Sequence, residues 1–136
     1  MREPYTQLYV HLVWATWDRL PLLDAKREAM VYACVQAECG KLGAEMIGIG
    51  GTEDHMHVVA RIPSTLAVAT LVKQLKGSSS HLVNHSGVGQ DTFKWQGAYG
   101  AFTVSKGAVK KVIDYLARQK EHHREGTAYE EYEPGE

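Results

Sequence analysis

The chain has 136 residues, 44% of them hydrophobic and 23% charged, and this balance predicts one compact domain. The formal net charge is −1, so the total charge does not favour a nucleic-acid partner. No apolar run approaches the roughly 20 residues that a membrane-spanning helix requires, so we expect no membrane association.

The first half of the sequence predicts two strands that flank a helix, followed by a third strand. Residues 5–16 alternate in polarity, as a half-buried strand does. Its apolar side carries Leu8, Val10, Leu12 and Trp14, and its other side carries Gln7, Tyr9, His11 and Val13. Asp24 can cap a helix that ends near Gly43. Residues 44–52 and 55–62 form two strands joined by a tight turn, so they should pair as an antiparallel hairpin.

The second half predicts a helix, a strand and a final helix. Pro63, Ser64 and Thr65 open a helix whose apolar stripe runs over residues 68–82. Residues 93–104 are rich in aromatic side chains and predict a strand, which Gly97 and Gly100 should bend. Ser105 is expected to cap the last helix, which turns these apolar side chains inward: Val109, Val112, Ile113 and Leu116.

This order, β-α-β-β-α-β-α, predicts an α+β domain with a ferredoxin-like antiparallel sheet. An extra C-terminal helix carries Tyr115. We expect the domain to span residues 1–125 and the acidic residues 126–136 to form a flexible tail. The first two helices should cover one sheet face, which leaves His55, His57 and Arg61 on the other.

Two histidines on one strand are the first candidate metal ligands. Side chains alternate along a strand, so His55 and His57 point to the same face while Met56 points to the other. Nearby glycines at positions 48, 50 and 51 should leave room for a ligand to approach. A bare His pair is more often structural than metal-binding, so a second group is needed.

Tyr115 and Gln119 supply that second group, four residues apart on the predicted last helix. We place Tyr115 at the border of the buried stripe, within reach of a groove. A phenol with a pKa of about 10 is a poor nucleophile unless a nearby cation favours the phenolate. Gln119 offers an amide oxygen that suits Mg²⁺ or Mn²⁺ beside the imidazoles. The combination indicates metal-assisted attack by tyrosine.

The charges are unevenly distributed along the chain. Residues 64–124 carry 9 basic and 3 acidic side chains, whereas residues 125–136 carry 5 glutamates and no basic residue. Candidate DNA-binding residues in the basic segment are Lys73, Lys76, Trp95, Lys110, Lys111 and Arg118. Tryptophan rings can stack on bases, and Trp17 is a further candidate for this role. Trp14 is not, because it faces the core. His81 and His85 have the spacing of a helical metal pair but no evident third ligand, which favours a solvated helix face.

Four segments of the chain resemble a known family. They are the His-Met-His strand and residues 76–80, 95–102 and 115–119. With them the chain resembles the single-tyrosine transposases of the insertion-sequence 200/605 type, which belong to the HUH (His-hydrophobic-His) endonucleases. The REP-associated tyrosine transposases are relatives of this group. The likeness covers residues 5–124.

The resemblance implies an enzyme that cuts and rejoins single-stranded DNA beside short hairpins, through a tyrosine linked to a 5′-phosphate. It implies Tyr115 as the nucleophile, and His55, His57 and Gln119 as ligands of Mg²⁺ or Mn²⁺. It also implies a homodimer whose tyrosine helix approaches the histidines of either subunit. The chain departs from the family in ending with an acidic tail instead of a basic extension.

Two other function classes stay open at this point. One is a non-catalytic or domesticated regulator that binds single-stranded DNA on the same scaffold. The other is an unrelated ferredoxin-like metal hydrolase in which water attacks instead of Tyr115. The two cysteines, Cys34 and Cys39, match no disulfide or zinc pattern, and the N-terminus does not resemble a secretion signal, so we expect a cytoplasmic protein.

Overall fold

The computed structural model describes residues 4–88 and 92–119, and the expected tail over 126–136 lies outside them. The strands are β1 (Leu8–Ala15), β2 (Glu45–Gly51), β3 (His55–Ile62) and β4 (Gly100–Val104). The helices are α1 (Ala25–Lys41), α2 (Val68–Asn84) and α3 (Val109–Ala117). Short 3-10 turns, η1 (Trp17–Arg19) and η2 (Lys106–Ala108), precede α1 and α3. Among the described helices, none has the length and apolar character needed to span a bilayer.

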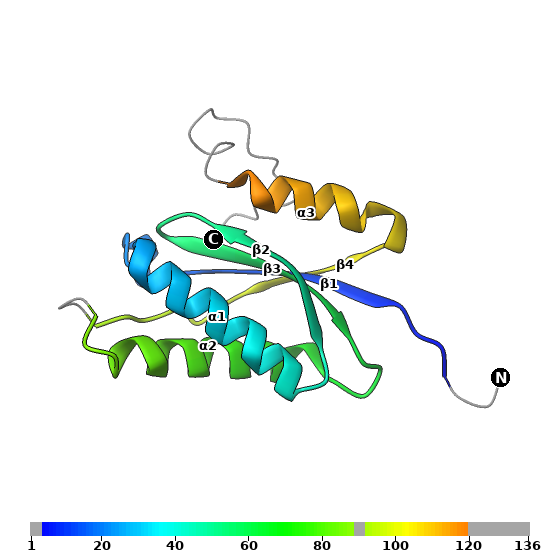
Figure 1. The fold of residues 1–136 in the computed structure, drawn as a ribbon, viewed down its shortest axis with the longest axis horizontal. Coiled ribbons are helices and arrows are strands. Elements are labelled where there is room, and N and C mark those ends of the chain that lie inside the picture. Colours follow the sequence, from blue (N-terminus) through cyan, green and yellow to red (C-terminus); the bar gives the residue numbers. More distant parts are fainter. Residues whose placement is uncertain (1–3, 89–91, 120–136) are drawn as a thin grey trace.

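The four strands form one antiparallel sheet in the order β2-β3-β1-β4. The first and third strands lie side by side in the middle, with the second and fourth at the edges, which is the split arrangement of the ferredoxin-like fold. Helices α1 and α2 cover one face of the sheet, and α3 covers the opposite face (Figure 1). The predicted fold and its extra helix are therefore confirmed.

Strand alternation divides the buried side chains between two cores. Leu12 and Trp14 of β1 pack with Met56 and Val58 of β3 in the main core beneath α1 and α2. A second, smaller core lies under α3, and it consists of Val59, Val112, Tyr115 and Leu116. The sheet face that the sequence predicts to carry His55 and His57 is thus covered by α3.

The start of α2 and the length of β4 differ from the predictions. Helix α2 begins at Val68, and its N-cap residue, Ala67, provides no side-chain cap, so Ser64 and Thr65 lie before the helix. Only residues 100–104 of the expected strand pair with β1. Upstream of them Trp95 forms an isolated bridge with Thr16, and Phe93 enters the main core. This segment is fixed by packing, which polarity alone does not reveal.

The last helix also starts later than expected. Ser105 leads into η2 and makes no side-chain cap, and α3 begins at Val109. Asp24 behaves as predicted, because its carboxylate accepts a hydrogen bond from the Arg27 amide at 2.9 Å and so caps α1.

Candidate active site

His55 and His57 lie on the central strand β3, on the face that α3 covers. Both side chains are buried, and their ring centroids are 5.2 Å apart at an interplanar angle of 75°. In the neighbouring strand β1, Ala15 pairs with His55 and Val13 pairs with His57. The two imidazoles are therefore held on a rigid, doubly paired strand, as the sequence predicts for their shared face.

His11 of β1 joins this pair from the adjacent strand. Its Nε2 lies 2.8 Å from Nδ1 of His57, and the two rings stack with centroids 5.0 Å apart. A hydrogen bond at Nδ1 fixes the orientation of the His57 ring, so Nε2 is the nitrogen that can bind a metal. Sequence alternation placed His11 on the correct face but assigned it no role. The pairing of β1 with β3 is the signal that would have linked it to His57.

His55 is oriented by residues of the turn that precedes it. Its Nδ1 lies 2.8 Å from Asp54 Oδ1 and 2.9 Å from Thr52 Oγ1. Asp54 also accepts a hydrogen bond from Arg19 at 3.2 Å. Burial acts to raise the pKa of Asp54, but the hydrogen bond from His55 and the charge of Arg19 outweigh it and lower the pKa below its ordinary value. A carboxylate behind a histidine is a common support for a metal ligand. The sequence offered only the adjacency of Asp54 and His55 as a signal.

Two glycines of β2 allow α3 to pack closely on the sheet. A Cβ at Gly50 would overlap the carbonyl oxygen of Leu116, and one at Gly48 would lie 2.9 Å from Cγ1 of Ile113. Gly50 is also the cross-strand partner of His57. The space that we expected for a ligand is therefore taken by α3, whose final turn lies over the strand pair that carries His57.

Tyr115 lies in this final turn and is only 4% exposed. It belongs to the second core with Val59, two residues beyond His57 on the same strand face. The expected border position, reachable from a groove, is wrong, because the close approach of α3 buries the edge of its apolar stripe. The helix nevertheless brings Tyr115 to the histidine face of its own chain.

Gln119 is buried on the same chain, but α3 ends at Ala117 before reaching it. Arg118 adopts φ −110° and ψ 23°, and its amide donates to the Tyr115 carbonyl at 3.1 Å. The spacing predicted that Tyr115 and Gln119 lie on one regular helix. In the structure α3 ends between them. Their proximity in sequence still keeps both at the end of α3 that overlies β2 and β3.

The side chains considered as ligands of a divalent cation are the imidazoles of His55 and His57 and the amide of Gln119. Within residues 4–88 and 92–119, no group of three or more His, Cys, Asp or Glu side chains is arranged to hold a metal. A metal beside His55 and His57 would thus need a ligand of another type. Gln119 is buried and carries an amide oxygen of that type, and imidazole and carboxamide groups together suit Mn²⁺ or Mg²⁺.

The basic candidates lie on two faces of the molecule. Lys110, Lys111 and Arg118 are exposed on or just after α3, on the histidine side. Lys73 is exposed on α2, across the sheet. Lys76, also on α2, donates to the carbonyl groups of residues 96 and 98, and burial lowers its pKa.

Trp95 does not fit its expected role in base stacking. It is buried in the main core, where its indole N–H donates to Ser79 at 3.0 Å. Its ring also meets Trp14 and Phe93 edge-on. A ring that stacks on a base must have an exposed face, and the Trp95 ring is buried. The prediction that Trp95 binds DNA is therefore wrong.

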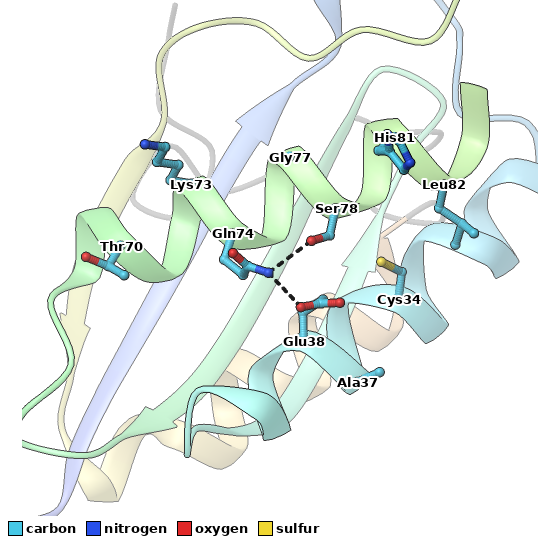
Figure 2. A pocket seen from close by; sticks show the side chains of 10 residues that line it. All are labelled: Cys34, Ala37, Glu38, Thr70, Lys73, Gln74, Gly77, Ser78, His81 and Leu82. Carbon is cyan, nitrogen blue, oxygen red and sulfur yellow. Dashed lines mark hydrogen bonds between the residues drawn. The ribbon is translucent and has the colours of Figure 1, made fainter. Parts of the chain in front are cut away.

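A hollow of about 870 Å³ lies between α1 and α2, on the side of the sheet away from the histidines (Figure 2). Gln74 bridges it by donating to Glu38 at 2.8 Å and to Ser78 at 3.2 Å. Hydrogen bonds from Gln74 and Lys41 lower the pKa of Glu38. His81 lines the hollow and stacks on His85 with centroids 4.0 Å apart. Both imidazoles are exposed, which agrees with a solvated helix face.

Solved structures share this fold. A candidate transposase from Deinococcus radiodurans aligns with a TM-score of 0.69 at 22% identity, over 88% of this chain and 95% of that one. A REP-associated tyrosine transposase bound to a REP hairpin aligns with a TM-score of 0.67 at 14% identity, over 94% of this chain and 74% of that one. At these identities the likeness concerns the fold.

Sequence comparison goes further. The transposases for insertion sequence element IS200 from Salmonella typhimurium and Salmonella typhi are each 26% identical to this chain over 122 residues. Each match covers 85% of this chain and 79% of the relative. Residues 4–119 match the family described as IS200-like transposases. This range holds the His-Met-His strand, the glycines beneath α3 and Tyr115, and the chain belongs to the IS200-like transposase family.

Proposed function

We propose that this protein cuts and rejoins single-stranded DNA, with Tyr115 as the nucleophile and a divalent metal held by His55, His57 and Gln119. One observation carries the proposal. The final turn of α3, with Tyr115, packs over the strand pair that contains His57, because Gly50 opposite His57 has no side chain. This packing puts Tyr115 and His57 on the same buried side of one chain's sheet, which supports the proposal.

The reaction that we assign to these residues is a transesterification. The Tyr115 oxygen forms a bond to the phosphorus and the bond from phosphorus to the 3′-oxygen breaks, so the downstream strand stays attached to the enzyme by its 5′-phosphate. The phenol loses its proton and the leaving 3′-oxygen gains one. In rejoining, a 3′-hydroxyl attacks the phosphotyrosine and the phenol is restored. Because one phosphodiester-type bond replaces another, no nucleotide cofactor is required.

A bound Mg²⁺ or Mn²⁺ would supply positive charge that polarises the phosphoryl group. The chain's own contribution is to fix its ligands before the substrate arrives. His11 orients His57, and Asp54 with Thr52 orients His55, each through Nδ1. These contacts support the assignment of both histidines as metal ligands.

The DNA partner is proposed to be a single strand that carries a hairpin, and the assembly a homodimer. The exposed basic residues Lys110 and Lys111 lie in the first turn of α3, Arg118 follows its last residue, and all three can contact phosphates. The relative that binds a REP hairpin has the same fold, which supports a hairpin here. Closed two-fold pairing would cover the exposed edges of the sheet.

The test uses 3′-labelled single-stranded oligonucleotides from the flanks of the protein's own gene. With Mn²⁺, the wild-type chain should convert the label into a slowly migrating covalent adduct on a denaturing gel. Chelator or Tyr115→Phe should abolish the adduct. Free cleaved product without an adduct would instead indicate attack by water, and binding without cleavage would indicate a regulator.

A further inference from the structure

Trp17 differs from the other two tryptophans of the chain in being open to solvent. It is 46% exposed, whereas Trp14 is 2% and Trp95 is 6% exposed. It lies in η1, two residues after Ala15, which pairs with His55 across the strands. An exposed indole therefore lies at the end of β1 next to the histidine-bearing strand.

The indole is accompanied by a cation and held on a fixed backbone. Nζ of Lys94 lies 3.8 Å from the centre of the Trp17 ring, and the Trp17 amide donates to the Lys94 carbonyl at 2.9 Å. Asp18 and Arg19 both have left-handed backbone conformations, with φ of 54° and 53°. Residues other than glycine keep such conformations where their surroundings fix them, often at functional sites.

The contacts that hold the backbone around Trp17 also connect it to His55. Thr16 donates to the Asp54 carbonyl through its amide at 2.9 Å and through its hydroxyl at 3.1 Å. Arg19 pairs with the Asp54 carboxylate at 3.2 Å, and that carboxylate lies 2.8 Å from Nδ1 of His55. The segment that presents Trp17 is thus attached to the turn that orients a proposed metal ligand.

A groove lined by both polar and apolar residues continues from Lys94. It has a volume of about 410 Å³, and its lining includes Lys76, Ser80, Asn84, Thr92 and Lys94. The Asn84 side chain fixes the backbone of Phe93 beside this groove: it donates to the Phe93 carbonyl at 2.8 Å and accepts from the Phe93 amide at 2.7 Å. Ammonium, hydroxyl and amide groups are the donors that contact phosphates of a nucleic-acid backbone.

We propose that Trp17 and Lys94 form a stacking platform for one unpaired base of the DNA strand that enters the active site, with the adjoining groove receiving its backbone. This inference rests on the proposed function. An exposed aromatic ring next to basic side chains is the usual means of holding single strands. A duplex does not suit it, because paired bases already stack on their neighbours. The positive lining distinguishes the platform from an apolar peptide site.

The test combines protein variants with a scan of the DNA. Single-stranded oligonucleotides from the gene flanks carry one abasic position each, and their binding to the full chain is measured by fluorescence anisotropy. For the wild-type protein, one position should lower affinity on the order of 10-fold. Trp17→Ala should lower affinity for the intact strand by a similar factor and should no longer respond to that position. Trp17→Phe should retain part of the affinity.

Tyr5→Ala is the matched control, because Tyr5 is 70% exposed and precedes the opposite end of β1. It should bind like the wild type. If Trp17→Ala also binds like the wild type, or loses the same factor on duplex DNA, the platform is wrong, although adduct formation by Tyr115 would leave the proposed function intact. If no form of the protein binds single strands or forms an adduct, both proposals are overturned.

Discussion

Nε2 of His11 lies 2.8 Å from Nδ1 of His57, across the central strand pair of the sheet. The contact joins a histidine of the His-Met-His strand to one that lies 46 residues earlier in the sequence. Because both rings are buried and stacked, the orientation of His57 depends on His11. His11 is thus a positioning residue for the proposed metal site.

We expect His11→Phe to fold, because an aromatic ring still packs beside Phe102, but to lose the hydrogen bond to His57. Loss of such an orienting contact lowers metal affinity by about 10–100-fold. Calorimetric titration with Mn²⁺ measures the change, and thermal unfolding without metal checks the fold. His81→Phe, at an exposed histidine on α2, should leave the affinity unchanged. Equal affinities of the wild type and His11→Phe would remove His11 from the site.

Gly50→Ala should displace α3, because the added methyl group would overlap the Leu116 carbonyl. Overpacking of this kind destabilises a protein by about 1–3 kcal/mol. Gly40→Ala is the control, since a Cβ there meets nothing within 4 Å and the residue lies in α1. It should be neutral or stabilise by up to about 1 kcal/mol. Denaturant unfolding gives both values, and equal stability of the two variants would contradict the close packing of α3.

The histidine and tyrosine of one site should come from the same chain. Helix α3 packs on its own sheet, with Tyr115 against Val59. Tyr115→Phe and His57→Ala chains are each expected to be inactive, and their mixture should stay inactive after subunits have been allowed to exchange. Recovery of cleavage in the mixture would show that the helix acts on a partner's histidines.

Binding of single-stranded DNA with a hairpin should weaken steeply as salt increases, because phosphate contacts release counterions. Lys111→Gln removes an exposed charge on α3 and should reduce the slope of log K against log salt by about 1. Lys26→Gln also removes one exposed positive charge, but from α1, and should not change the slope. Identical slopes for all three proteins would exclude Lys111 from the DNA interface.

The sequence was sufficient to predict the faces of the central strands. Alternation assigned Leu12 and Met56 to the main core, and His11 and His57 to the other face, as the structure shows. It could not predict that Tyr115 is buried. That burial depends on Gly48 and Gly50 of β2, which lie far from α3 in sequence and allow the helix to approach.

Contacts between elements also account for the other differences. Phe93 and Trp95 have the alternation of a strand, but they are held by the main core and by Ser79 of α2 instead of by a full β-ladder. The supports of the histidines, His11 and Asp54, come from a neighbouring strand and a turn. Such pairs become visible only once strand order is known.

The identity of the nucleophile is tested most directly by locating the covalent bond. After reaction with single-stranded DNA from its own flanks and Mn²⁺, the protein is digested with nuclease and trypsin. Residues 112–118, Val-Ile-Asp-Tyr-Leu-Ala-Arg, form a tryptic peptide that contains Tyr115 as its tyrosine. We predict that mass spectrometry finds a nucleotide joined through its 5′-phosphate to Tyr115 in this peptide. Cleaved DNA with the nucleotide on another residue, or on none, would contradict the account.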